Sequence, residues 1–130
     1  MENAVRRGLA VWAFSHSAHR LEKTDLVEPV DRDARSLDDI TATLTGTRAI
    51  FYALGIKDRQ EALIMDSDLD WTTARPIILT NSQKSRRSTV LREPSYWRNG
   101  LVSRRDVACY LVNAVEDGLD IRTDVVLTRS

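Results

Sequence analysis

Cysteine, histidine and net charge are all scarce in this sequence of 130 residues. Cys109 is the single cysteine, which excludes an internal disulfide framework and any zinc site built from several cysteines. The two histidines, His16 and His19, are too few for a histidine-rich metal centre. Lys plus Arg and Asp plus Glu each number 19, so the basic excess typical of nucleic-acid binders is absent. We therefore expect no metal site and no nucleic-acid partner.

Long apolar runs are missing as well. No stretch approaches the roughly 20 residues that cross a bilayer, and the first residues lack the apolar core of a signal peptide. We expect no membrane association and a cytoplasmic, reducing location. With 42% hydrophobic and 29% charged residues, the composition is not that of a disordered chain. Its length predicts one domain over residues 1–130.

Short apolar runs alternate with helical patterns along the chain. The runs at 9–14, 49–54, 71–75 and 123–127 are of strand length and mostly apolar, which is typical of strands covered on both faces. Between or before them, apolar residues at helical spacing predict helices at 1–7, 37–44, 58–66 and 104–115. This alternation predicts βαβ units in a parallel, doubly wound sheet.

Two serines mark expected helix starts. Ser36 precedes Asp38 and Asp39, and a serine cap followed by acidic residues in the first turn favours a helix N-terminus. Ser103 stands in the same position before the helix that begins at Arg104. Gly8 is expected to stop the first helix in a left-handed conformation.

Familiar catalytic motifs are absent from the sequence. No Tyr-x-x-x-Lys pair, Gly-x-Ser-x-Gly elbow or Walker-type loop occurs, and the five dispersed glycines form no G-x-G-x-x-G. Cys109 falls on the apolar side of an expected helix, where a small core residue is the simpler interpretation than a nucleophile. The residues alone therefore identify no acid, base or nucleophile.

Three polar segments could serve binding. Ligands of open α/β sheets lie beyond the carboxyl ends of strands, and His16 and His19 follow the first expected strand, so they either meet a ribose or phosphate or are solvated. The stretch from Lys84 to Arg105 holds seven basic residues and one acid. It is either a solvated loop or a phosphate-facing patch. Arg75 either ends its strand or lines a ligand crevice.

Several segments together resemble one family. The segment 69–80, LDWTTARPIILT, resembles the "LDWTIVRPGxLT" segment of atypical short-chain dehydrogenases that bind NAD(P)H, the group with NmrA-like and biliverdin-reductase-B-like proteins. Residues 101–108, LVSRRDVA, resemble the family's "x-I-S-R-A-D-V-A" helix start. Further similarity covers Gln60–Ile64 with Ser67, Val11–Leu21, Asp31–Asp33 and Gly46–Gly55.

The resemblance implies a fold, a cofactor and a set of site residues. The fold is Rossmann-like α/β, with a mostly parallel sheet flanked by helices, and the cofactor is NADP or NAD. His16 takes the position of an Arg that contacts the adenosine 2′-phosphate, and histidine is a weaker, pH-dependent substitute. Asp33 and Ala34 would approach the adenine. The nicotinamide side would be formed by Ala53, Leu54 and Gly55 along the ribose and by Pro76, Ile77 and Ile78 beside the ring; Arg75 would be structural.

Two family elements have no counterpart in the sequence. The first strand with its glycine-rich turn would precede Met1, and a central strand would stand between Gly55 and Asp58. We therefore expect an incomplete family fold with weakened cofactor binding, since the turn holds the pyrophosphate. Strands without neighbours would leave exposed edges through which the chain could form homo-oligomers.

The function expected from the resemblance is that of an NAD(P)H-dependent reductase. Hydride would pass from NAD(P)H to a small-molecule acceptor such as a flavin or a quinone, with the protein supplying position and electrostatics. The alternative is a non-catalytic, NmrA-like module that senses the dinucleotide or binds a protein partner. A third hypothesis is that the chain is a truncated product that folds poorly.

Overall fold

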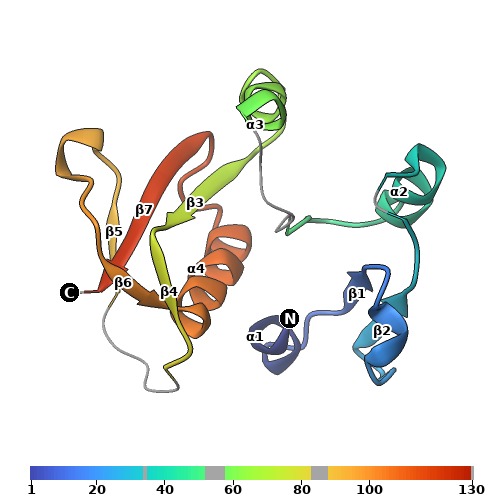
Figure 1. The fold of residues 1–130 in the computed structure, drawn as a ribbon. Helices are drawn as coiled ribbons and strands as arrows, with labels where there is room; N and C mark the ends of the chain where they lie inside the picture. The colour runs from blue at the N-terminus through green and yellow to red at the C-terminus, as the bar shows by residue number, and fades with distance from the viewer. Residues whose placement is uncertain (34, 52–57, 83–87, 130) are drawn as a thin grey trace. The chain divides into compact units, whose positions relative to one another are not determined.

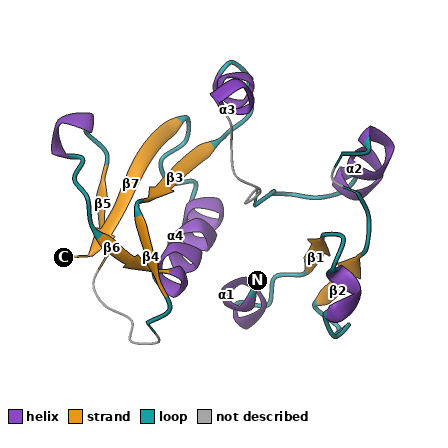
Figure 2. Ribbon diagram, viewed as in Figure 1, coloured by secondary structure: helices purple, strands orange, loops and turns teal. Residues whose placement is uncertain are grey.

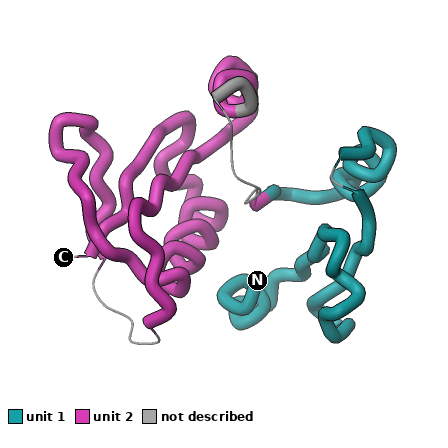
Figure 3. The backbone as a smooth tube through the Cα atoms, viewed as in Figure 1, with its two compact units in different colours: residues 1–50 teal, residues 51–130 magenta. Residues whose placement is uncertain are grey.

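The computed structural model describes residues 1–33, 35–51, 58–82 and 88–129. The chain divides into two compact units, unit 1 over Met1–Ile50 and unit 2 over Phe51–Ser130 (Figure 3). Helices and strands occur in both units (Figure 2). Each unit contains at least one pair of parallel strands.

Unit 1 is built on one parallel strand pair (Figure 1). Helix α1 (Glu2–Arg6) ends before Gly8, whose φ of 76° is the left-handed conformation expected at this stop. Strand β1 (Val11–Phe14) is followed by the short 3-10 helix η1 (Ala18–Arg20) and by strand β2 (Val27–Val30).

The register of this pair places the ends of the two strands together. Val11 lies opposite Val27 and Phe14 lies opposite Val30, so both strands finish at the same edge of the sheet. The ladder continues one step further, because the Ser15 backbone N–H donates to the Val30 carbonyl at 3.2 Å. The polar segments that follow β1 and β2 are therefore neighbours.

Helix α2 (Leu37–Leu44) follows β2 and begins at the predicted cap. The Ser36 hydroxyl accepts a hydrogen bond from the Asp39 backbone N–H at 3.3 Å, which satisfies one of the first N–H groups of the helix. The start and end of the helix match the prediction. Its apolar stripe is not buried, since no residue of α2 is buried and Leu37 is 76% exposed.

Unit 2 is organised around strand β7 (Thr123–Arg129). Strand β3 (Thr72–Pro76) pairs with it in parallel, and strand β5 (Ser88–Leu91) pairs with its other edge in antiparallel fashion. Val125 and Leu127 of β7 are the largest fully buried side chains among the described residues. The core of unit 2 therefore centres on β7.

A second parallel pair and a long helix complete unit 2. Strands β4 (Ile78–Thr80) and β6 (Leu101–Ser103) pair in parallel, and helix α4 (Arg104–Asp117) follows β6 directly. The Ser103 hydroxyl accepts from the Asp106 backbone N–H at 3.0 Å, as its position in the sequence predicts. Helix α4 packs against β3 and β6 (Figure 1). The remaining elements are α3 (Asp58–Met65) and the 3-10 helix η2 (Pro94–Tyr96).

The structure corrects three expectations from the sequence. A strand was expected at 49–54, but residues 49–51 form no strand and Phe51 is 48% exposed; residues 52–54 lie outside the described part. Leu63 belongs to the helix that apolar spacing predicts at 58–66, and it is 68% exposed rather than buried. Trp12 of β1 is 47% exposed, so this strand is not covered on both faces. In each case an apolar pattern predicted burial, which depends on neighbouring elements that a local pattern does not specify.

Two features are absent from the part of the chain that the structure describes. None of the helices there has the length and apolar character needed to cross a membrane. No group of three or more His, Cys, Asp or Glu side chains in the same residues could hold a metal ion.

Candidate functional site

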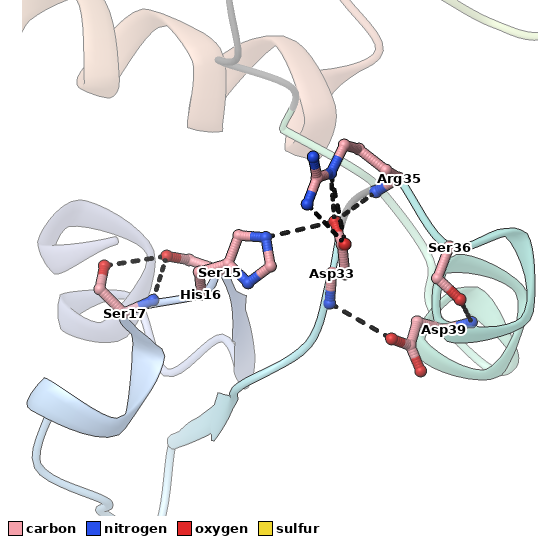
Figure 4. A network of polar contacts seen from close by, with 7 residues as sticks. All are labelled: Ser15, His16, Ser17, Asp33, Arg35, Ser36 and Asp39. Carbon is pink, nitrogen blue, oxygen red and sulfur yellow. Dashed lines mark hydrogen bonds and ion pairs between the residues drawn. The ribbon is translucent and has the colours of Figure 1, made fainter.

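The candidate site in unit 1 lies where β1 and β2 end side by side. The polar segment that begins with Ser15 and His16 follows β1, and the segment leading to Asp33 follows β2. Parallel pairing brings the two segments to the same edge (Figure 4). The carboxyl ends of parallel strands are the usual place for ligands in open α/β sheets.

Asp33 is the centre of this cluster. His16 Nε2 lies 3.2 Å from Asp33 Oδ1. Three atoms of Arg35 donate to the same carboxylate: its backbone N at 2.8 Å, Nε at 3.2 Å and Nη2 at 3.1 Å. The carboxylate therefore accepts from a guanidinium fork and also faces an imidazole (Figure 4).

These contacts fix the charge of Asp33. Hydrogen bonding from the Arg35 side chain, then from the Arg35 backbone, lowers the pKa of Asp33 to about 2. The same contact raises the pKa of Arg35. Asp33 is therefore an anion at every pH near neutrality, because hydrogen bonds to the charged form favour that form.

The first turn of α2 holds the Asp33 segment in place. The Asp33 backbone N–H donates to Asp39 Oδ2 at 3.2 Å, and Arg32 Nη1 donates to Asp39 Oδ1 at 3.3 Å. The Asp39 backbone N–H is itself bonded to the Ser36 cap (Figure 4). The Asp39 carboxylate thus links the first turn of α2 to Arg32 and Asp33.

The segment after β1 is shaped by two serines. The Ser15 hydroxyl accepts from the Ser17 backbone N–H at 3.0 Å, and the two hydroxyls lie 3.0 Å apart (Figure 4). His19, the other histidine, has a different partner: its Nδ1 lies 2.7 Å from Asp31 Oδ2. The cluster therefore offers hydroxyl, imidazole, carboxylate and guanidinium groups, the types of group that bind sugar hydroxyls and phosphates.

Three other predicted residues lie in unit 2, at the end of β3. Pro76 is half-buried and is paired in register with Leu127. Ile77 and Ile78 follow it and are 44% and 50% exposed. Both isoleucine side chains are therefore accessible from solvent.

Arg75, next to Pro76, is engaged with neighbouring acids. Its Nε and Nη2 donate to Asp124 of β7, the latter at 2.7 Å, and its guanidinium also pairs with Glu61 of α3. These contacts tie α3 to the sheet. The expectation that Arg75 is structural agrees with this placement.

A further polar cluster, in unit 2, is structural. Tyr110 Oη donates to Asp120 Oδ2 at 2.8 Å, and Arg92 Nη2 donates to the same oxygen at 3.0 Å. Burial and the bond to Asp120 raise the pKa of Tyr110, while the Arg92 side chain lowers the pKa of Asp120. Tyr110 therefore keeps its proton and does not act as an acid or base near neutral pH.

Among the residues predicted from sequence, His16 and Asp33 are brought into contact, and Pro76, Ile77 and Ile78 are adjacent in unit 2. Ala34, Ala53, Leu54 and Gly55 lie outside the described residues. Within the basic stretch, Arg92 pairs with Asp120 and Arg104 Nη1 donates to Asn81 Oδ1 at 2.6 Å. These contacts indicate a structural role for Arg92 and Arg104.

Sequence reasoning did not find Arg35, Ser15 or Ser17 as members of the cluster. Arg35 stands two residues after Asp33, a spacing at which an aspartate often accepts from the following backbone. This spacing could have predicted the contact between Asp33 and Arg35. The contact with His16 depends on the β1–β2 register, which no local spacing shows.

A hollow on the surface of α3 contains none of the predicted residues. Its volume is about 420 Å³ and it is lined by Ala62, Leu63, Met65 and Asp66. It is open to solvent, and among the described lining residues Asp66 is the charged one.

Comparison with known proteins identifies the fold. Residues 56–118 match a protein-family model described as NAD(P)H-binding. Among solved structures, a Rossmann-fold NAD(P)-binding family protein from Shigella flexneri is similar, with a TM-score of 0.83 at 14% identity. The similarity covers 98% of this chain and 84% of that protein. No curated protein sequence matches the chain.

The predicted fold class is confirmed by this likeness. The chain has a Rossmann-like α/β fold with parallel strands and flanking helices. The one antiparallel pair described, β5 with β7, is compatible with a mostly parallel arrangement. The family match supports NAD or NADP as the cofactor.

Proposed function

We propose that this chain is an NAD(P)H-binding oxidoreductase of the atypical short-chain dehydrogenase type. Hydride would pass from the bound nicotinamide to a flavin, a quinone or a similar small acceptor. The protein would act in the cytoplasm, as one domain over residues 1–130. The NAD(P)H-binding family match and the Rossmann-type neighbour support this proposal. The bound cofactor supplies the hydride chemistry, whereas the chain binds and orients it.

The observation that carries the proposal is the polar cluster at the joint end of β1 and β2. Parallel pairing places His16 within 3.2 Å of Asp33 at this edge. In dinucleotide-binding folds, the groups at this edge hold the adenosine ribose, through an acidic residue for NAD or a cation for NADP. We assign His16, Asp33 and Ala34 to the adenosine half of the cofactor.

The nicotinamide half is assigned to residues of unit 2. Pro76, Ile77 and Ile78 would flank the ring, and the exposure of the two isoleucines leaves them available for it. Ala53, Leu54 and Gly55 would line the ribose. Apolar side chains beside the ring would exclude water from the path of the hydride.

Binding and turnover test the proposal separately. NADH and NADPH are titrated against the chain by cofactor fluorescence, and turnover is followed with dichlorophenolindophenol or a flavin as acceptor. We expect weak, saturable binding and acceptor reduction. His16→Ala should weaken binding, whereas His19→Ala, the matched control at the other histidine, should not.

The outcomes distinguish the candidate functions. Saturable binding without turnover of any acceptor would favour the dinucleotide-sensing or partner-binding module over the reductase. Absence of binding by either reduced cofactor would contradict both. Size-exclusion chromatography of the same sample shows whether copies of the chain form a homo-oligomer, as exposed strand edges would allow.

A further inference from the structure

The two outer edges of the β1–β2 strand pair differ in how their backbone groups are used. Along an extended strand, successive residues direct their backbone N–H and C=O groups to opposite edges. The N–H groups of Val11 and Ser15 donate to carbonyls of the segment 26–30, which contains β2, at 2.8 Å and 3.2 Å. Trp12 and Phe14 stand at the alternate positions, so their backbone groups point to the other edge of β1.

The outer edge of β2 is closed by the chain itself. Val27 and Pro29 are the residues of β2 whose backbone positions face this edge. The Val27 N–H donates to the Thr24 carbonyl at 3.3 Å and to Thr24 Oγ1 at 3.1 Å, and the Val27 carbonyl accepts from the Thr24 N–H at 3.0 Å. Pro29 has no N–H group. Neither residue therefore offers a free donor to another strand.

The outer edge of β1 lacks this protection among the described residues, where β2 is the one strand neighbour of β1. The segment 9–14, Leu-Ala-Val-Trp-Ala-Phe, contains neither a charged residue nor a proline, the residues that usually protect a sheet edge. The side chain of Trp12 is exposed. Within the described part of the chain, two N–H donors and two carbonyl acceptors thus lie unpaired on an uncharged strand, which is what strand addition requires.

We propose that the outer edge of β1 binds a second copy of this chain, with the two β1 strands antiparallel about a two-fold axis at Ala13. In this register Trp12 of each copy lies opposite Phe14 of the other. The open backbone groups of the two strands then face one another and form four hydrogen bonds. The result is one sheet of four strands in the order β2-β1-β1-β2, which is more stable than a lone strand pair.

Two features of the sequence favour a second copy as the occupant of this edge. Trp12 and Phe14 lie on one face of β1, so the two-fold register places an aromatic side chain opposite an aromatic side chain, a cross-strand pair that stabilises sheets. The charges at the two ends of β1 are also complementary. Residues 1–8 carry two arginines and one glutamate, whereas residues 31–39 carry four aspartates and two arginines. Antiparallel pairing brings the first segment of one copy toward the second segment of the other.

The closed edge of β2 sets the size of the assembly. In the four-stranded sheet both outer edges belong to β2, and at each of them Val27 is already bonded to Thr24. A third copy therefore has no open strand edge to extend. The expected product is a dimer, because an isologous contact between two identical edges uses both of them.

Sedimentation velocity over a range of concentrations tests the pairing in the intact chain and in Trp12→Lys. Trp12 lies opposite Glu28 in the β1–β2 register, so the lysine faces a carboxylate within its own copy and the strand pair is preserved. At the interface, the same change removes the aromatic pairs and places a charge beside the partner strand. We expect a monomer–dimer equilibrium in the intact chain and a dissociation constant about tenfold higher or more in the variant.

Glu28→Gln is the matched control for Trp12→Lys. It changes the net charge by the same single unit at the register partner of Trp12, but on β2, one strand away from the interface. Its dissociation constant should equal that of the intact chain. Circular dichroism shows whether each variant is folded. Trp12→Thr, which keeps a strand-forming residue and removes the aromatic ring, replaces Trp12→Lys if that variant is not folded.

A cysteine at position 13 tests the register. Ala13→Cys is made together with Cys109→Ser, so that the chain carries one thiol. The two copies of position 13 face each other as a non-hydrogen-bonded pair with Cα atoms about 4.5 Å apart, which is within disulfide range. Mild oxidation should therefore give a covalent dimer. Ser15→Cys in the same background is the control, because its two copies would lie about 13 Å apart along the sheet, too far for a disulfide.

Each other result would overturn the pairing. A chain that stays monomeric at every concentration has no second copy on this edge, and an equal dissociation constant in folded Trp12→Lys and Trp12→Thr places the contact elsewhere. Equal cross-linking from positions 13 and 15 contradicts the two-fold axis at Ala13, and assemblies larger than two contradict the closed edge of β2. The pairing needs no cofactor, so all of these results leave the proposed function to its own test with NADH and NADPH.

Discussion

Arg75 of β3 reaches across the sheet of unit 2 to Asp124 of β7, which lies opposite Thr73 in the register. Its Nε lies 3.0 Å from both carboxylate oxygens, and its Nη2 lies 2.7 Å from Oδ2. The guanidinium also pairs with Glu61, so a single side chain links two strands and a helix. A flat fork with several donors is required for this arrangement.

Arg75→Lys should therefore destabilise unit 2. Lysine keeps the charge but cannot make the forked contact with Asp124 while pairing with Glu61. Because Arg75 is 37% exposed, solvent screens the interaction, and we expect a loss of about 1 kcal/mol in the free energy of unfolding. Urea unfolding followed by tryptophan fluorescence measures it. Arg98→Lys, at an exposed arginine, is the control, and equal losses in the two variants would refute the structural role of Arg75.

Tyr110→Phe should change how stability depends on alkaline pH. The pKa of Tyr110 is raised in the folded state, so its stabilising contribution is present below its ordinary pKa near 10 and is lost as pH rises toward the folded value. Between the ordinary pKa and the pKa in the folded state, the free energy of unfolding of the intact chain should fall by about 1 kcal/mol per pH unit relative to that of the variant. In denaturant unfolding from pH 8 to pH 11, the difference in the free energy of unfolding between the intact chain and the variant should decrease as the pH rises.

The control for this experiment is Tyr96→Phe, since Tyr96 is 69% exposed. Its stability should follow that of the intact chain at every pH. At neutral pH, Tyr110→Phe removes a hydrogen bond from Asp120, which costs about 1–2 kcal/mol. A variant as stable as the intact chain at pH 7 would contradict the structural role of this bond.

Asp33 should titrate well below an ordinary aspartate. Its pKa is lowered to about 2 by Arg35, so a carboxyl NMR signal should titrate with a midpoint near that value. A lowered pKa gives stability that is complete above the ordinary value of about 4 and is lost as pH falls toward 2. Arg35→Ala should return the midpoint toward 4, whereas Arg32→Ala should leave it near 2, because Arg32 bonds Asp39 instead.

Gly100→Ala should disturb the packing next to β7. A Cβ at position 100 would overlap the Thr128 hydroxyl and would lie 2.8 Å from Thr128 Cβ. Thr128 is 2% exposed and has little room to move, so we expect a loss of about 1–3 kcal/mol. Adding Thr128→Ala removes the closest atom and should restore part of the loss. If the double variant is no more stable than Gly100→Ala, the clash is not the cause.

The elements that sequence predicted best are those specified by local chemistry. Helix α2 begins after Ser36 and helix α4 after Ser103, and in each the serine hydroxyl accepts the bond that its position predicts. The stop at Gly8 is equally local, because it needs one residue in a left-handed conformation. Such signals lie within a few residues and need no knowledge of neighbouring elements.

The parts that sequence did not predict depend on distant partners. Arg75 and Asp124 are 49 residues apart, and the antiparallel orientation of β5 follows only from its pairing with β7. The short strand β4 lies in a segment that the pattern left unassigned, because three residues are too few to show a period. His16 and Asp33 were each singled out, yet their contact required the register of β1 and β2.

The position of β7 has a consequence for how unit 2 is made on the ribosome. This strand supplies the partner for both β3 and β5 and most of the deepest core, yet it follows every one of its partners in the chain. Neither β3 nor β5 can therefore complete its hydrogen bonds until residues 123–129 have left the exit tunnel. During synthesis, Tyr110 and Ala114 of α4 therefore remain without Val125 and Leu127 of β7, their partners in the core, and a nascent chain that exposes apolar surface in this way is prone to aggregate.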